Sequence, residues 1–420
     1  MSNRVQTHRR TACRLCGSAQ LESVLSLTPT PPANAFVPAS ALEERQDTYP
    51  LDVHLCGDCG HLQLLDVIDA RALFEEYLYV SGTSPVMVAH LRDYAAHVIE
   101  RLALKPGDLV VEIGSNDGTL LGFFQQAGMR VLGIDPARNI VARATEDGIE
   151  TLAEFFTPAL AARILKSHGP AAAICANNVC AHIDDLKGVI EGVRGLLAPD
   201  GLFIFEVSYL LDVYENRLFD TIYHEHLDYH RVGPLRRFFR ENGMAFVDAQ
   251  RVSTQGGSLR GFVRSAGSDG EGGGEEGAAV DELEALERAA GLEKPETYRL
   301  FAAQIEHRRV ELTALLKGLK AEGKMVAGYG APAKATTLMY HFGLGRDVIE
   351  FIVDDNPLKQ GLYSPGLHVP VLAVDALYER RPDYVVVLAW NFADSIVAAH
   401  PAFTEAGGRF VIPLPNLTIR

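Results

Sequence analysis

The sequence lacks three features that would assign a chain of this length to a particular class. No apolar run reaches the roughly 18 residues that a membrane-spanning helix needs. Basic residues are outnumbered, 39 against 54 acidic, and the net charge of −15 excludes a surface built throughout for nucleic acid or anionic lipid. Residues 1–14 have no apolar stretch of the kind found in secretion signals. We therefore expect a cytoplasmic protein without a nucleic-acid or membrane partner; its oligomeric state stays open.

Cysteine is also scarce, with six residues among 420. Four of the six form two Cys-x-x-Cys pairs, which are Cys13 with Cys16 and Cys56 with Cys59. In a reducing compartment such pairs bind metal more often than they form disulfides, and two pairs complete a tetrahedral zinc site without an open position. The pattern predicts a structural Zn²⁺ ion. Since a long segment separates the pairs, the alternative is reduced thiols in two unrelated turns.

The rest of the chain has an α/β pattern. Short apolar runs alternate with helical patterns from about residue 91, and they lie at residues 109–113, 130–134, 171–174 and 202–205. This alternation is typical of a doubly wound parallel sheet. A second α/β pattern has apolar runs at residues 325–328, 349–353 and 384–388. Residues 266–279 are poor in apolar side chains, which predicts a flexible linker between the two patterns.

The first apolar run leads into a glycine-containing turn. In Val110-Val-Glu-Ile-Gly-Ser-Asn-Asp-Gly118 a strand precedes a helix, so that backbone can approach a ligand and helix amides face it. The turn is not the GxGxxG of dinucleotide enzymes. Glu112 in the strand favours S-adenosylmethionine (SAM), and Asp135, at the end of the next strand, suits a ribose diol. The alternative is a glycine turn with an ordinary capping carboxylate.

Three histidines lie within Tyr223-His-Glu-His-Leu-Asp-Tyr-His230. Imidazoles titrate near neutrality, so one of them could act as a general base oriented by Glu225 or a tyrosine. Alternatively, His224, Glu225 and His226 could bind a metal ion, although the spacing is not that of HExxH. A polar surface loop is the third possibility.

A second glycine-containing turn follows the strand at residues 325–328. In Gly328-Tyr-Gly-Ala-Pro-Ala-Lys-Ala-Thr-Thr337 the pattern resembles a phosphate-binding turn, with Lys334 and hydroxyl groups as anion contacts. Asp355, at the end of the next strand, could contact a nucleoside hydroxyl. The alternative is an ordinary strand-to-helix turn with a surface lysine.

Together these segments resemble the SAM-dependent sugar C-methyltransferases, which methylate C-3 of nucleotide-linked 4-keto deoxysugars. The resemblance spans almost the whole chain and includes the cysteine pairs around TPPANAF, YLYVSGTS at residues 77–84, VEIGSNDGTLL, NNVCAH at residues 177–182, FEVS at residues 205–208, YHEH at residues 223–226, GGS at residues 256–258 and GYGAPAKATT. Ala335-Thr336 stands where relatives often have Gly-Asn.

The resemblance implies a fold of three domains. These are a small zinc-binding domain at residues 1–75, a class I methyltransferase-type doubly wound domain at residues 76–265, and a Rossmann-like domain at residues 280–420 that helps to bind the sugar nucleotide. The implied cofactors are SAM and a structural zinc ion, and the implied substrate is a dTDP-linked keto-deoxysugar.

The resemblance and the chemistry of carbon methylation together imply the site residues. A base removes the proton next to the ketone, and the enolate carbon attacks the methyl group; His226 is the expected base. The other expected catalytic residues are Tyr223, Glu225, His182 and Tyr77. The expected SAM contacts are Glu112, Gly114, Ser115, Asn116, Gly118, Asp135 and Asn178. The expected sugar-nucleotide contacts are Tyr79, Tyr329, Gly330, Ala331, Lys334 and Asp355.

Three other functions remain as alternatives. An O- or N-methyltransferase would share the fold but need no enolate. A nucleotide-dependent oxidoreductase would need a nicotinamide site, which the missing GxGxxG disfavours. A zinc-containing interaction protein would have no activity.

Overall fold

The computed structural model describes residues 6–77, 80–266 and 277–420. The chain forms two compact units. Unit 1 comprises residues 1–22, 55–211 and 227–294, and unit 2 comprises residues 23–54, 212–226 and 295–420. Each unit is therefore built from segments that are distant in the sequence.

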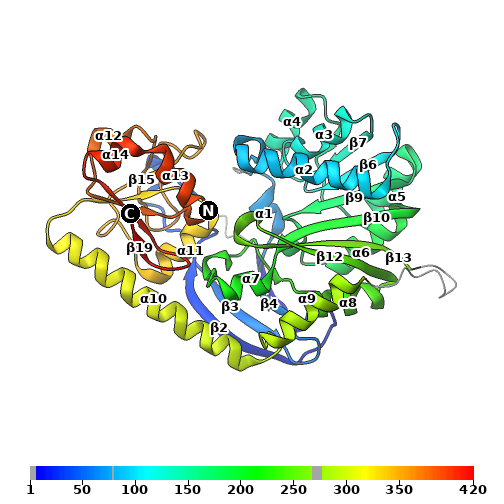
Figure 1. Cartoon of the computed structure of the whole chain (residues 1–420), viewed down its shortest axis with the longest axis horizontal. Helices are drawn as coiled ribbons and strands as arrows, with labels where there is room; N and C mark the ends of the chain where they lie inside the picture. Colours follow the sequence, from blue (N-terminus) through cyan, green and yellow to red (C-terminus); the bar gives the residue numbers. More distant parts are fainter. Residues whose placement is uncertain (1–5, 78–79, 267–276) are drawn as a thin grey trace. The chain divides into compact units, whose positions relative to one another are not determined.

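Unit 1 contains a seven-stranded sheet in the order β12-β13-β10-β9-β6-β7-β8 (Figure 1). Its strands are β6 (Leu109–Ile113), β7 (Arg130–Ile134), β8 (Thr151–Leu152), β9 (Ala171–Asn177), β10 (Leu197–Ser208), β12 (Met244–Val252) and β13 (Ser258–Ser265). The five strands from β6 to β10 are parallel, and β13 is antiparallel to both β10 and β12. The order reverses beside β6, the position at which open α/β sheets bind ligands beyond the carboxyl ends of their strands.

Helices lie on both faces of this sheet (Figure 1). They are α2 (Pro85–Leu102), α3 (Thr119–Gln126), α4 (Arg138–Glu146), α5 (Pro158–His168), α6 (Leu186–Leu196), α8 (Val232–Glu241) and α9 (Ala278–Ala289). Two of them begin with a capping hydroxyl followed by proline: Ser84 caps α2 and Thr157 caps α5. Leu91 and Val98 of α2 and Phe124 of α3 belong to one buried core with Val110 of β6. This packing fixes the strand end that carries the glycine turn.

The remaining elements of unit 1 are short. They are β1 (Thr7–Arg9), β4 (Leu62–Leu64), β5 (Asp66–Ile68), α1 (Ala70–Phe74), η2 (Ser81–Thr83), η3 (Cys180–His182), β11 (Asp228–Tyr229) and η5 (Thr254–Gly256). Strand β1 pairs with β5 and β11 pairs with β4, both antiparallel.

Unit 2 contains a six-stranded sheet in the order β16-β15-β14-β17-β18-β19. Its strands are β14 (Val326–Tyr329), β15 (Ile352–Val353), β16 (Val371–Leu372), β17 (Tyr384–Val387), β18 (Arg409–Ile412) and β19 (Thr418–Ile419). All neighbours are parallel except β18 and β19. This mostly parallel sheet agrees with the Rossmann-like fold expected for residues 280–420.

The helices of unit 2 include one that is much longer than the others. They are η1 (Ala39–Ala41), η4 (Phe219–Thr221), α10 (Pro295–Ala321), α11 (Ala333–Phe342), α12 (Ala376–Arg380), η6 (Trp390–Phe392), α13 (Ala393–Ala399) and α14 (Pro401–Glu405). Three elements cross the boundary between the units along the chain: β2 (Leu21–Thr30), β3 (Tyr49–Cys56) and α7 (Leu210–Glu215). No described helix is long and apolar enough to cross a membrane.

Candidate active site and metal centre

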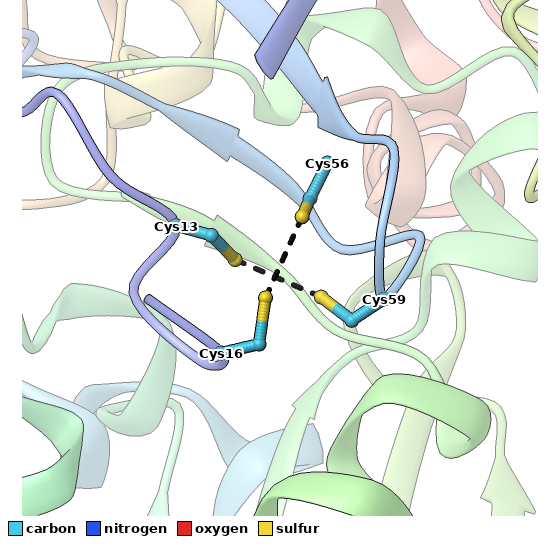
Figure 2. A group of neighbouring side chains, drawn as sticks. All are labelled: Cys13, Cys16, Cys56 and Cys59. Atoms are coloured by element: carbon cyan, nitrogen blue, oxygen red, sulfur yellow. Dashed lines mark hydrogen bonds between the residues drawn. The ribbon is translucent and has the colours of Figure 1, made fainter. Parts of the chain in front are cut away.

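The four paired cysteines lie together in unit 1. Their sulfur atoms point toward one another from two turns and all lie within 4.8 Å (Figure 2). The Sγ atoms of Cys13 and Cys59 are 3.7 Å apart, and those of Cys16 and Cys56 are 3.6 Å apart. A tetrahedral zinc ion with Zn–S bonds of about 2.3 Å holds its sulfurs roughly 3.8 Å apart. The donor set and the spacing both fit a four-thiolate zinc ion.

The glycine turn after β6 is held by its own polar side chains. Both carboxylate oxygens of Asp135 accept backbone hydrogen bonds of 2.9 Å, one from Asn116 and one from Ala137. Asn116 accepts a 2.9 Å hydrogen bond from the backbone of Ser81. Burial raises the pKa of Asp135, against the lowering effect of these N–H donors. The expected ribose ligand is thus also the residue that shapes the turn.

Three buried polar groups around this turn have no hydrogen-bond partner among the described residues. They are Oε2 of Glu112, Oγ of Ser115 and the side-chain amide of Asn177. Buried polar atoms are usually paired, so unpartnered ones beside a ligand-binding strand end suggest a missing partner. Burial also raises the pKa of Glu112 well above its usual value, which favours the protonated form, a donor as well as an acceptor. These groups fit a bound nucleoside.

Gly114 and Asn178 lie at the edge of the same site. Gly114 has φ +70°, and a Cβ built there would come within 2.9 Å of the Val179 side chain. Asn178 has φ +55° and donates its backbone N–H to the carbonyl of Glu206 at 2.7 Å. Gly118, with φ +75°, begins α3. The turn therefore brings together the residues that the sequence predicted as SAM contacts.

His182 and Tyr77 are brought close by a third residue. The ring of Phe74 stacks on His182 at 5.4 Å between centroids and contacts Tyr77 at 5.9 Å. Both backbone groups of Tyr77 also bond the side chain of Asn139. Tyr79, one of the predicted sugar contacts, lies outside the described residues.

In unit 2, the hydrogen bonds of His226 fix the tautomer of its neutral imidazole. Its Nδ1 lies 2.7 Å from the carbonyl oxygen of Thr221, and because a carbonyl only accepts, Nδ1 carries the proton. Nε2 is therefore the basic nitrogen, and it accepts a 2.9 Å hydrogen bond from the hydroxyl of Tyr223. Burial is the main cause that lowers the pKa of His226 to about 4; the nearby Lys334 ammonium contributes to the lowering, and the hydrogen bond to Thr221 opposes it. The residue is a neutral imidazole with its base position fixed.

The neighbouring side chains of this segment point to other partners. Nε2 of His224 donates to the carbonyl of Tyr49 at 3.2 Å, and Glu225 accepts a 2.8 Å hydrogen bond from Asn34. His224 and His226 thus direct ring nitrogens to different backbone carbonyls. Among the described residues, the four cysteines are the one group with metal-binding geometry. The geometry favours the base interpretation of the segment over a shared metal ion.

The turn after β14 is also clamped. Ala331 donates its N–H to Asp354 at 2.5 Å, and its carbonyl accepts from Nζ of Lys359 at 2.7 Å. Gly330 has φ +84°, and a Cβ there would lie 2.5 Å from that of Ala389. The Tyr329 hydroxyl donates to Asp355 at 3.3 Å. Four of the predicted nucleotide contacts of this unit, Tyr329, Gly330, Ala331 and Asp355, therefore lie at one end of its strands.

Three family models match this chain. Residues 13–74 match a family described as "Putative zinc binding domain", residues 87–249 match "Methyltransferase domain", and residues 253–415 match "C-methyltransferase C-terminal domain". C-methyltransferase NovU of Streptomyces niveus is 40% identical over 404 residues, which cover 96% of this chain and 95% of that protein. The chain belongs to the SAM-dependent C-methyltransferase family.

More distant relatives share only the methyltransferase part. The ubiquinone biosynthesis O-methyltransferase of Burkholderia pseudomallei is 26% identical over 167 residues, 37% of this chain and 72% of that protein. The magnesium protoporphyrin IX methyltransferase of Synechocystis PCC 6803, solved with SAM, is 19% identical over 43% of this chain and 82% of its own, with a TM-score of 0.32.

Membership of the C-methyltransferase family decides several open questions. The chain is an enzyme, its acceptor atom is carbon rather than oxygen or nitrogen, and its cofactors are SAM and a zinc ion held by the four cysteines. The oxidoreductase and interaction-protein alternatives are excluded with it. The fold is the expected class I methyltransferase type with an N-terminal zinc-binding part and a second α/β sheet.

Sequence reasoning missed two groups around the site. Asn177, next to the predicted Asn178, is the residue whose amide is buried without a partner. Glu206, at the end of β10, accepts hydrogen bonds from His90 at 2.8 Å and from Arg260 at 3.0 Å. Burial opposes ionisation of Glu206, but these donors outweigh it and lower its pKa. A polar residue that ends a parallel strand was the available signal for both.

Proposed function

We propose that this C-methyltransferase methylates C-3 of a nucleotide-linked 4-keto deoxysugar, with dTDP as the expected nucleotide. A sugar carbon becomes a nucleophile only after a neighbouring ketone has acidified its C–H bond. The enzyme must therefore supply a neutral base that is ready before the substrate arrives. The observation that carries the proposal is His226, whose imidazole is neutral, with its Nδ1 proton on the Thr221 carbonyl and its unprotonated Nε2 accepting the Tyr223 hydroxyl.

In this reaction Nε2 of His226 removes the C-3 proton, which leaves an enolate whose C-3 carbon is nucleophilic. Tyr223, which already bonds Nε2, is expected to orient the imidazole or to bond the substrate oxygen once the proton has moved. General base catalysis of this kind contributes about 10²–10⁴-fold. His182 and Tyr77 are the proposed contacts near the keto group, and Glu225 is the proposed support for the base segment.

The proposed cofactor site uses the β6 turn. SAM supplies the electrophilic methyl group when bound. Asp135 and the unpartnered groups of Glu112, Ser115 and Asn177 would receive its nucleoside hydroxyls and ring nitrogens. Residues 280–420 are proposed to hold the nucleotide, through Tyr329, Gly330, Ala331, Lys334 and Asp355.

The deciding experiment locates the transferred carbon. The zinc-containing enzyme is incubated with methyl-¹³C SAM and a panel of dTDP- and UDP-linked 4-keto sugars, and the product is analysed by NMR. A new methyl group bonded to C-3 is the expected result. Transfer to a hydroxyl or amino group, or to another ring carbon, would refute the proposal.

A second measurement isolates the base. Without SAM, the enzyme should exchange the C-3 hydrogen of the sugar for deuterium in heavy water, and His226→Gln should slow this exchange by about 10²–10⁴-fold. His368→Gln, a histidine of the same unit that the proposed mechanism does not use, is the matched control and should retain the exchange rate. Near-normal exchange by His226→Gln would show that another group is the base.

A further inference from the structure

Lys334 is the residue of unit 2 whose position the proposed function explains least. It is the second residue of α11, and the chemistry of its turn predicts contact with a phosphate group. Its Nζ atom instead lies 3.8 Å from the centre of the Trp390 ring. The indole Nε1 of Trp390 in turn donates a 2.6 Å hydrogen bond to Asp220, a completely buried carboxylate. The ammonium group is therefore held over an aromatic face, with a carboxylate behind it.

The cluster of Lys334, Trp390 and Asp220 adjoins the proposed base. Asp220 and His226 belong to one short segment of the chain, and Thr337 of α11 donates a 2.8 Å hydrogen bond to the carbonyl of Ile222 within that segment. The positive charge of Lys334 lowers the pKa of His226, and the negative charge of Asp220 raises the pKa of Lys334. The helix that carries the ammonium group is thus fixed to the segment that carries the imidazole.

The position of Lys334 is energetically unfavourable in two respects, which a purely structural role does not explain. A cation in the first turn of a helix opposes the helix dipole, and partial burial removes water from the ammonium group. One carboxylate oxygen of Asp220 is also buried without a hydrogen-bond partner. Within residues 6–77, 80–266 and 277–420, no acceptor forms a hydrogen bond with Nζ of Lys334. Its N–H donors are free to bind an oxygen atom of a ligand.

We propose that Lys334 is a catalytic residue of the deprotonation step. Its ammonium group binds the C-4 oxygen of the keto sugar while Nε2 of His226 takes the C-3 proton, and Asp220 and Trp390 are the residues that position it. The inference rests on the proposed function and moves Lys334 from the phosphate end of the substrate to its reacting end.

The step balances without a further reactant. The C-3–H bond breaks, its proton goes to Nε2 of His226, and its electron pair forms the C-3=C-4 bond while the C-4 oxygen becomes an enolate oxyanion. Lys334 keeps its protons and donates a hydrogen bond to that oxyanion. A positive imidazolium and a positive ammonium then flank one negative enolate. Preorganised donors at a developing oxyanion are typically worth about 10²–10³-fold in rate.

The test is C-3 deuterium exchange at saturating dTDP-4-keto-6-deoxyglucose without SAM, together with the dissociation constant of that sugar nucleotide. Lys334→Met should slow exchange by about 10²–10³-fold and change the dissociation constant less than about threefold. Lys334→Arg, which keeps the charge, should recover at least about tenfold of that loss. Lys317→Met, which removes an exposed lysine of the same unit, is the control and should match the wild type.

Two results would overturn the inference. If Lys334→Met exchanges at the wild-type rate at saturation but binds the sugar nucleotide about tenfold more weakly, Lys334 contacts the phosphates. If both quantities are unchanged, it contacts neither. A wild-type far-UV circular dichroism spectrum and normal SAM binding identify folded variants. A wild-type enzyme that neither exchanges C-3 hydrogen nor methylates C-3 would refute the proposed function itself, so the two failures are distinguishable.

Asp220→Asn tests the positioning role through the pH profile. Burial lowers the pKa of Lys334 to about 8, against the raising effect of the Asp220 charge. The amide keeps an acceptor for Trp390 but removes the charge, so the basic limb of the exchange rate should move to lower pH. If Asp220 had only a structural role, the rate would fall equally at every pH. A basic limb at the wild-type pH would therefore contradict the assignment.

Discussion

Among single residues, His226 decides the pH range in which the enzyme can work. Its pKa of about 4 lies below the value of about 6.5 for an exposed histidine, because burial disfavours the imidazolium form. We expect the rate of C-3 exchange to stay constant from about pH 7 down to about pH 5 and to fall only below that. NMR measurements of the exchange rate at a series of pH values check this. An acid limb centred at about pH 6.5 would mean that the imidazole is solvated in the working enzyme.

His224 should instead affect stability. Burial lowers its pKa to about 4, whereas in the unfolded chain it titrates near 6.5. Between about pH 4 and about pH 6.5 His224 binds a proton in the unfolded chain but not in the folded chain, so acid favours unfolding. The loss reaches about 3 kcal/mol at pH 4 and is absent above about pH 7. Urea unfolding followed by Trp390, the single tryptophan and a residue of unit 2, should therefore show a smaller decline with acid in His224→Gln.

The same fluorescence measurement contains its own control. Zinc release in acid would act on the wild type and on His224→Gln alike, so only the difference between their declines reports on the imidazole. Equal declines in both proteins would show that His224 is not the group that titrates.

The sequence predicted residues that belong to local motifs and missed those that tertiary structure brings in. The cysteine pairs, the β6 turn and His226 each stand in a recognisable string of neighbours. Asp220 and Trp390 are 170 positions apart and touch through one hydrogen bond, so no spacing rule could associate them. Glu206 and Arg260 are a similar case, since their pairing depends on the register of β10 and β13.

Among secondary-structure elements, the sequence prediction agreed best with the structure for buried strands. The predicted runs at residues 109–113 and 130–134 coincide with β6 and β7, because both strands carry β-branched and leucine side chains between turn residues. The strand predicted at residues 349–353 is too long, because only Ile352 and Val353 form β15. A short apolar run cannot reveal which of its residues pair with a neighbour, since pairing depends on the adjacent strand.

The turn between β6 and α3 should not tolerate a side chain at Gly114. In Gly114→Ala the new methyl group would meet the Val179 side chain at 2.9 Å, with φ at +70°. We expect a loss of about 1–3 kcal/mol in stability and a larger loss of SAM affinity, because the turn must move away from the ligand. Isothermal titration with SAM, alongside thermal unfolding, measures both quantities.

Gly122→Ala is the matched control for this turn. Gly122 lies in α3 with nothing within 4 Å of a built Cβ, so alanine there should stabilise the helix by about 0.5–1 kcal/mol and leave SAM binding unchanged. If both variants bind SAM normally, the turn is not the cofactor site.

For the whole molecule, the sequence suggested three consecutive domains, whereas the chain folds into two interleaved units. Residues 23–54 belong with the C-terminal sheet, and residues 212–226, which carry His226, belong there too. The segment boundaries at residues 75 and 265 follow composition and motif order, which record position along the chain only. Which segments pack together depends on long-range contacts that a single sequence does not display.

The zinc ion should matter for unit 1 as a whole. It would join two turns that are distant in the sequence, at Cys13–Cys16 and at Cys56–Cys59, and so close a loop that leaves the unit and returns to it. Without the metal, closing that loop costs chain entropy, and the four adjacent thiols lose their shared cation. Cys16→Ser should therefore release zinc to a chelator and expose residues 6–68 to protease. Elemental analysis and limited proteolysis measure the two effects. Asp58→Asn, an exposed change in the second turn, should keep one zinc ion per chain and the protease resistance of the wild type. A wild-type protein that is fully folded and equally resistant without zinc would refute the structural role of the four cysteines.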